Sequence, residues 1–133
     1  MGKPRILVCD DEEIIRKGTK LILGEDYDLV FAEDGDQALA QFKAHQPIDL
    51  VILDIKMPGK NGLEVLSELM QTQPPPRVLM LTAYHSVELA QRAAQSFALD
   101  YLTKPFERDA LRKAVDRALG LPEWQRSPRQ PEA

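Results

Sequence analysis

Residues 49–59, with the sequence DLVILDIKMPG, decide the fold of this chain. Four apolar residues in succession, 50–53, lead directly into the acidic Asp54, and a turn containing Pro58 and Gly59 follows. An apolar run without polar alternation is typical of a parallel strand that is covered by helices on both faces. These residues therefore predict a central strand of a parallel sheet, with a carboxylate at its carboxyl end.

The same pattern of an apolar run that stops at a polar residue recurs along the chain. The runs are residues 6–9, 29–32, 50–53 and 78–81, with a shorter one at 101–102. Between the runs, apolar residues fall at helical spacing within residues 14–22, 38–42, 63–70, 87–97 and 106–118. Strict alternation of five strands and five helices predicts an α/β fold, a doubly wound five-stranded parallel sheet.

The composition is that of one ordinary globular domain. The chain has 133 residues, 44% of them hydrophobic and 29% charged, and its formal net charge is −4. Such a chain lacks the basic field that attracts nucleic acid or anionic lipid, so we expect no nucleic-acid or membrane partner. No apolar run approaches the ~18–20 residues of a membrane-spanning helix. The single cysteine, Cys9, cannot form an intrachain disulfide, which favours a cytoplasmic protein.

The composition changes near the end of the chain. Residues 121–133 contain three of the ten prolines and little apolar content. We therefore expect one domain over residues 1–120, followed by a flexible tail or the start of a linker over residues 121–133.

Polar side chains stand where the predicted strands end. Asp10 and Asp11 follow the first strand, Asp54 follows the third, Thr82 follows the fourth, and Lys104 comes just beyond the fifth. Ligands bind outside the carboxyl ends of the strands in open parallel sheets. We therefore expect these five side chains on one rim of the sheet.

Three neighbouring carboxylates repel one another unless a cation lies among them. Mg²⁺ suits a site of few carboxylates that also receives a phosphate group. Lys104 adds a positive charge and Thr82 a hydroxyl donor, so the rim is equipped for phosphoryl transfer onto a carboxylate. Each residue alone also fits an ordinary role, such as a helix N-cap or a solvated lysine. The joint placement of all five favours the site.

Four stretches of this chain resemble the receiver domain of two-component response regulators. They are residues 6–12, 49–62, 81–83 and 100–106, and the resemblance covers about residues 4–120. It implies a flavodoxin-like sheet with strand order 2-1-3-4-5, and a receiver domain over residues 1–120.

The resemblance also implies a role for the acidic residues. Asp54 would be the phosphoacceptor, and the phosphoryl donor would be a sensor histidine kinase or a phosphotransfer protein. Mg²⁺ would be the cofactor, held by Asp10, Asp11, Asp54 and the backbone carbonyl of Lys56.

Five residues receive further roles from the resemblance. Lys104 would pair with the phosphoryl group, and the Lys104–Pro105 peptide would be cis. Thr82 would hydrogen-bond to the phosphoryl group, and Tyr101 would be the aromatic switch that turns inward as Thr82 moves. Lys56 and Tyr84 would tune the rate of dephosphorylation.

The output surface implied by the resemblance is the face of the fourth helix, the fifth strand and the fifth helix. This face would contact a downstream output domain or protein, and it is a candidate homodimer interface. The chain would then be a phosphoprotein in phosphorelay signal transduction. It would be a switch that catalyses its own phosphorylation and dephosphorylation, not an enzyme acting on a separate substrate.

Two alternatives stay open at this point. An aspartyl-phosphate phosphatase or mutase of the haloacid dehalogenase type would carry a second Asp two residues after the nucleophile, where this chain has Lys56. A receiver-like scaffold that works without phosphate would not require all five rim residues, and this chain has them all.

Overall fold

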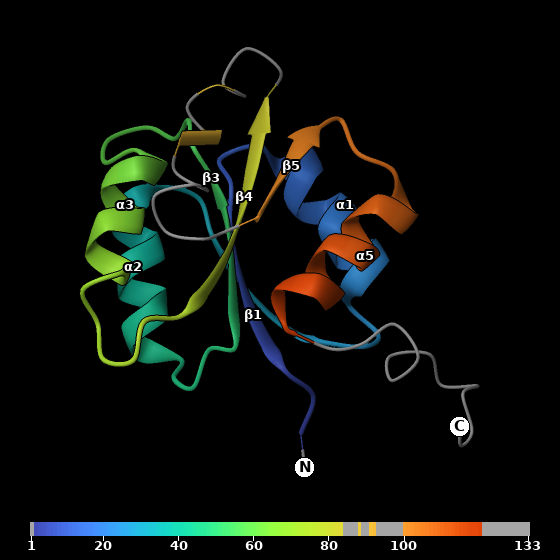
Figure 1. The fold of residues 1–133 in the computed structure, drawn as a ribbon, viewed down its shortest axis with the longest axis horizontal. Coiled ribbons are helices and arrows are strands. Elements are labelled where there is room, and N and C mark those ends of the chain that lie inside the picture. The colour runs from blue at the N-terminus through green and yellow to red at the C-terminus, as the bar shows by residue number, and fades with distance from the viewer. Residues whose placement is uncertain (1, 84–87, 89–90, 93–99, 121–133) are drawn as a thin grey trace.

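The structure is a computed structural model that describes residues 2–83, 88, 91–92 and 100–120. Strands and helices alternate through this part of the chain (Figure 1). The elements are β1 (Arg5–Cys9), α1 (Glu13–Leu23), β2 (Asp28–Ala32), α2 (Gly35–Ala44), β3 (Leu50–Asp54), α3 (Gly62–Leu69), β4 (Arg77–Ala83), β5 (Asp100–Lys104) and α5 (Arg108–Ala118).

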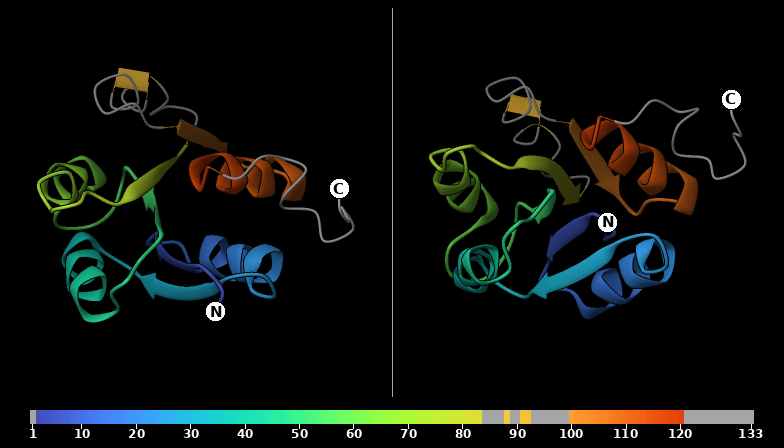
Figure 2. Two further views of the ribbon diagram at one scale, coloured as in Figure 1. Left: turned by 60° about the horizontal axis from the view of Figure 1, so that its bottom comes forward. Right: turned by 90° about the horizontal axis from the view of Figure 1, so that it is seen from below.

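The five strands form one parallel sheet in the order β2-β1-β3-β4-β5, which confirms the predicted topology. Helices α2 and α3 cover one face of the sheet, and α1 and α5 cover the other (Figures 1 and 2). Helices on both faces make this the doubly wound arrangement that the sequence predicts.

The core has two halves, one on each face of the sheet. Alternate residues of the central strands point to opposite faces, so Val51 and Leu53 pack toward α2 and α3 while Ile52 packs toward α1 and α5. All five residues of β3 are buried. Two apolar layers therefore require apolar residues at every position of this strand, which explains the uninterrupted run at residues 50–53.

Three polar residues lie inside strands, and the prediction that they follow the strands was wrong by one or two positions. Asp54 is the last residue of β3, Thr82 lies within β4, and Lys104 is the last residue of β5. Parallel pairing of β4 with β5 extends past the apolar runs: Thr82 pairs with Thr103, and Ala83 pairs with Lys104. Backbone hydrogen bonds to a neighbouring strand, not side-chain polarity, decide where these strands end.

The predicted helix over residues 87–97 falls mostly outside the described residues. Glu88, Gln91 and Arg92 are helical, and the four complete helices α1, α2, α3 and α5 lie within the described part of the chain. The expected tail at residues 121–133 also lies outside it, so that boundary stays a prediction. None of the described helices combines the length and the apolarity that crossing a bilayer requires.

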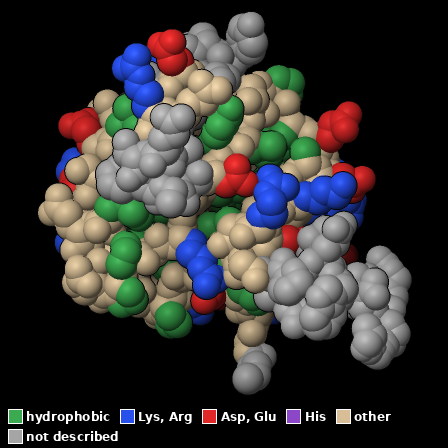
Figure 3. Space-filling model, in the orientation of Figure 1, with side chains coloured by type: hydrophobic (Ala, Val, Ile, Leu, Met, Phe, Trp, Pro, Cys, Tyr) green, Lys and Arg blue, Asp and Glu red, His purple; other side chains and the backbone are tan. Residues whose placement is uncertain are grey.

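Polar contacts fix α5 to its surroundings. Arg117 pairs with Asp100 at 3.0 Å, and Arg112 pairs with Asp26 at 2.8 Å. The Tyr27 hydroxyl donates to the buried Asp116 at 3.0 Å. Basic and acidic side chains accordingly lie beside one another on the α5 side of the molecule (Figure 3).

Candidate functional site

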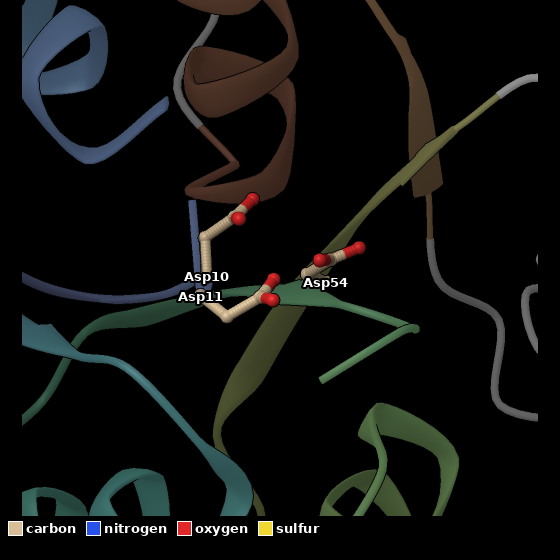
Figure 4. A group of neighbouring side chains, drawn as sticks. All are labelled: Asp10, Asp11 and Asp54. Atoms are coloured by element: carbon tan, nitrogen blue, oxygen red, sulfur yellow. The ribbon is translucent and has the colours of Figure 1, made fainter. Parts of the chain in front are cut away.

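Three carboxylates meet at the carboxyl ends of two adjacent strands (Figure 4). Asp10 and Asp11 directly follow β1, and Asp54 ends β3, which pairs with β1. Each residue offers one carboxylate oxygen, and these oxygens all lie within 4.8 Å of one another. Asp10 and Asp54 are buried while Asp11 is exposed, so this acidic cluster opens to solvent through Asp11.

Lys104, the last residue of the edge strand β5, reaches the same cluster. Its Nζ atom lies 2.8 Å from Oδ2 of Asp10 and 3.3 Å from Oδ2 of Asp54. The side chain is 9% exposed, and the Lys104–Pro105 peptide that follows is cis. The structure therefore brings together four of the residues that the sequence places on the rim.

Burial perturbs the titration of both inner carboxyls. Burial and the charge of Asp10 together raise the pKa of Asp54 to about 6, although the Lys104 ammonium and the hydrogen bond from the Lys56 N–H work against both effects. Burial also raises the pKa of Asp10. The pKa of Lys104 itself is raised, because its close contacts with the Asp10 and Glu12 carboxylates and the other nearby negative charge outweigh its own burial. One ammonium thus leaves the cluster short of positive charge.

The acidic cluster fits a divalent cation. Asp10 Oδ2 is buried and forms an ion pair with Lys104, but it accepts no hydrogen bond from the described part of the chain. Carboxylate oxygens are the hard ligands that Mg²⁺ prefers, and the exposed Asp11 leaves room for the water ligands that this ion retains. The donor set and its charge therefore match Mg²⁺.

The loop after β3 folds back against the backbone of Asp54. The N–H of Lys56 donates to Oδ1 of Asp54 at 3.4 Å, and the N–H of Gly62 donates to the carbonyl of Ile55 at 2.8 Å. A Cβ atom at position 62 would collide with the carbonyl oxygen of Asp54. Only glycine fits at this position, and sequence reasoning did not single it out.

Beside this loop lies a groove of about 400 Å³ that includes Asp11 of the acidic cluster in its lining. The lining residues are Asp11, Ile55, Lys56, Met57, Pro58, Asn61 and Leu63. The loop therefore contacts Asp54 and also lines the groove that reaches Asp11.

Thr82 and Tyr101 lie on the neighbouring strands. Leu81 pairs with Asp54, and the buried Thr82 is the next residue of β4. Tyr101 is half-buried on β5, and its hydroxyl accepts a hydrogen bond from Nε2 of Gln91 at 3.1 Å. Tyr84 lies outside the described residues.

Sequence reasoning gave no site role to Glu12, which the structure brings into direct contact with Lys104. Oε1 of Glu12 lies 2.9 Å from Nζ of Lys104. The available signal was a third acidic residue immediately after Asp10 and Asp11. That signal equally fits an acidic residue at the start of a helix, so only the fold separates the two readings.

Comparison with known proteins agrees with the family resemblance seen in the sequence. The response regulator receiver domain family matches residues 6–116. The chain is 37% identical over 116 residues to an uncharacterized response regulatory protein of Staphylococcus epidermidis and 38% identical over 117 residues to the transcriptional regulatory protein HptR of Staphylococcus aureus. These matches cover 84% and 85% of this chain but 45% of each relative, so the chain spans about half their length.

A solved structure gives the same result. The receiver domain of a response regulator from Clostridium thermocellum superposes with a TM-score of 0.81 at 32% identity, covering 88% of this chain and 94% of that one. The haloacid dehalogenase alternative finds no support, since Lys56 stands where that class carries its second Asp. Because the family match spans most of the described fold, the chain belongs to the response regulator receiver domain family.

Proposed function

We propose that this domain accepts a phosphoryl group on Asp54 in a Mg²⁺-dependent reaction, and that the modification switches its output surface. One observation carries this proposal. Carboxylate oxygens of Asp10, Asp11 and Asp54 lie within 4.8 Å of one another, and the Lys104 ammonium lies 3.3 Å from Asp54. This combination of a buried carboxylate, a cation site and a fixed ammonium suits phosphoryl transfer to a carboxylate.

The transfer itself needs little covalent chemistry from the protein. A carboxylate oxygen of Asp54 attacks the phosphorus of a phosphohistidine, the P–N bond breaks as the new P–O bond forms, and the imidazole leaves with a proton from solvent. Lys104 holds a positive charge beside the acceptor oxygen. Such groups act by offsetting the charge on the transferring phosphoryl oxygens.

Asp10, Asp11, Asp54 and the backbone carbonyl of Lys56 would hold the Mg²⁺ ion. When bound, the ion supplies positive charge to both the carboxylates and the phosphoryl oxygens. The buried Oδ2 of Asp10, to which none of the described residues donates a hydrogen bond, supports this assignment. Lys56 and Tyr84 would tune the return reaction, in which water removes the phosphoryl group.

The switch would run through Thr82 and Tyr101. A phosphoryl group adds about −1.5 to −2 charges and three acceptor oxygens beside β4. The Thr82 hydroxyl would turn toward these oxygens, and the Tyr101 ring would follow into the space beside β4. The half-buried state of Tyr101 supports this role, because such a ring can move without opening the core.

The output surface would be β5, α5 and the segment 87–97, read by a downstream output domain or protein or by a second copy of the domain. The family supports a sensor histidine kinase or phosphotransfer protein as donor. The HptR relative is a transcriptional regulator about twice as long as this chain. We propose likewise that residues 1–120 form a cytoplasmic receiver domain, and that residues 121–133 continue as a tail or linker.

The direct test is labelling with acetyl phosphate in the presence of Mg²⁺. Asp54→Asn should abolish labelling, because the amide offers no nucleophilic carboxylate. Asp36→Asn is the matched control, since it removes the same charge from an exposed position on α2 and should be labelled like the parent chain. Undiminished labelling of Asp54→Asn would place the acceptor elsewhere and overturn the proposal.

A further inference from the structure

Lys104 is shared among three carboxylates, and one of them lies outside the proposed metal site. Its Nζ atom lies 2.8 Å from Asp10, 2.9 Å from Glu12 and 3.3 Å from Asp54. The ammonium donates a hydrogen bond to Glu12 and forms ion pairs with Asp10 and Asp54. A phosphoryl group that arrives at Asp54 must therefore compete with these carboxylates for the Lys104 ammonium.

Glu12 is the contact that is released most easily. Its side chain is 54% exposed, whereas the side chains of Asp10 and Asp54 are 0% and 5% exposed. A released Glu12 carboxylate returns to water, but a released Asp10 carboxylate would stay buried without its counter-ion. Burying an unpaired charge is far more costly than breaking an exposed ion pair.

The local backbone holds Glu12 in place for this contact. Its N–H donates to Oδ1 of Asp10 at 2.9 Å, which ties residue 12 to the acidic cluster. Glu12 is the N-cap residue of α1, but its side chain makes no capping hydrogen bond. The carboxylate instead reaches Lys104, 92 positions away along the chain. The side chain is thus committed to Lys104 and not to its own helix.

We propose that Glu12 is a positioning residue that restrains phosphorylation. It holds the Lys104 ammonium in its resting position, and it competes with the incoming phosphoryl group for that ammonium. It also adds a negative charge at the exposed edge of the cluster, which opposes an anionic donor. This inference rests on the proposed function of Asp54.

The comparison of Glu12→Gln with Glu13→Gln tests this proposal. Glu13 is the neighbouring residue, equally acidic and exposed, but it pairs with Lys17 at 3.3 Å instead of Lys104. Both substitutions remove one negative charge at nearly the same place. With acetyl phosphate and Mg²⁺, Glu12→Gln should be phosphorylated about two- to fivefold faster than Glu13→Gln, the range expected for an exposed ion pair.

Ionic strength gives a second prediction for the same pair of variants. Salt screens exposed ion pairs, so the difference in rate between the two variants should shrink as the salt concentration rises toward 1 M. Equal rates at low salt, or slower labelling of Glu12→Gln, would overturn the proposal. Failure of the unsubstituted chain to label would instead overturn the proposed function, and this inference with it.

A metal-free measurement is independent of phosphorylation. In a double-mutant cycle on the unfolding free energy, Glu12→Gln and Lys104→Met should be coupled, and Glu13→Gln and Lys104→Met should be additive. Additivity of both pairs would show that Glu12 does not restrain Lys104 and would overturn the proposal even if the rates differed.

Discussion

Strands β3 and β5 carry the two oppositely charged side chains that meet in the site, yet the protein embeds them very differently. All five residues of β3 are buried, and the strand lies between β1 and β4. All five residues of β5 are half-buried, and the strand pairs only with β4 at the edge of the sheet. Asp54 therefore stands on the most enclosed part of the fold, and Lys104 on a more accessible one.

This difference separates two requirements of a switch. An acceptor carboxylate must keep its position relative to a metal and an incoming donor, which a fully packed strand provides. A responding group must move at modest free-energy cost, which is easier on an element with fewer buried contacts. The four predictions below test this contrast between a fixed central strand and an adaptable edge strand.

The largest effect is expected for matched truncations in the two strands. Leu53→Ala removes a completely buried side chain of β3 and should cost about 3–4 kcal/mol of unfolding free energy. Leu102→Ala removes the same atoms from a half-buried position of β5 and should cost about half as much. Urea denaturation measures both values. Equal losses would contradict the contrast between the strands.

The second prediction concerns the charge that β3 buries. The pKa of Asp54 is raised to about 6 from 3.8, so between these values the folded state binds more protons than the unfolded state. Stability of the metal-free chain should therefore fall as the pH rises from about 4 to above 6, by on the order of 2–3 kcal/mol. Asp54→Asn should remove this loss, gaining stability at pH 7 but little at pH 4.

Thermal or urea denaturation in a chelating buffer checks this pH dependence. Asp36→Asn serves again as the control, and it should leave the pH profile unchanged. Saturating Mg²⁺ should stabilise the parent chain at pH 7 and should do so less for Asp54→Asn. If Asp54→Asn raised the unfolding free energy equally at pH 4 and pH 7, the charge of Asp54 would not be the cause of the pH dependence.

The third prediction addresses the loop that supports β3. Gly62→Ala should cost about 2 kcal/mol and weaken Mg²⁺ binding, because the new Cβ would collide with the backbone of Asp54. Gly18→Ala on α1 is the control, since a Cβ there meets no atom of the described residues within 4 Å. It should instead stabilise the chain by up to about 1 kcal/mol. Unchanged Mg²⁺ affinity in Gly62→Ala would exclude a positioning role.

The smallest effect is expected at the edge strand. Tyr101→Phe removes the partly exposed hydrogen bond to Gln91 and should cost less than about 1 kcal/mol. Tyr27→Phe removes the hydrogen bond to the buried Asp116 and should cost more, about 1–2 kcal/mol. Denaturation curves of the two variants give the comparison. If Tyr101→Phe lost more unfolding free energy than Tyr27→Phe, the Tyr101 ring would be held firmly in place. A switch residue should not be held in this way.

Much of the fold was predictable, because the signal for a central strand is local. The runs at 6–9, 50–53 and 78–81 became β1, β3 and β4 since strands with two covered faces need apolar residues at every position. The bounds of β5 were less predictable, because Thr103 and Lys104 join the strand only through pairing with β4. The strand order came from the family resemblance, as strand–helix alternation alone fits several orders.

The sequence by itself determined the α/β class, the covered strands and the polar residues at their carboxyl ends, because these depend on the pattern of neighbouring residues. The tertiary structure alone decided that Glu12 meets Lys104 and that Gly62 touches the backbone of Asp54. Such contacts depend on how crossovers bring distant strand ends and loops within a few ångströms. No local periodicity encodes that geometry.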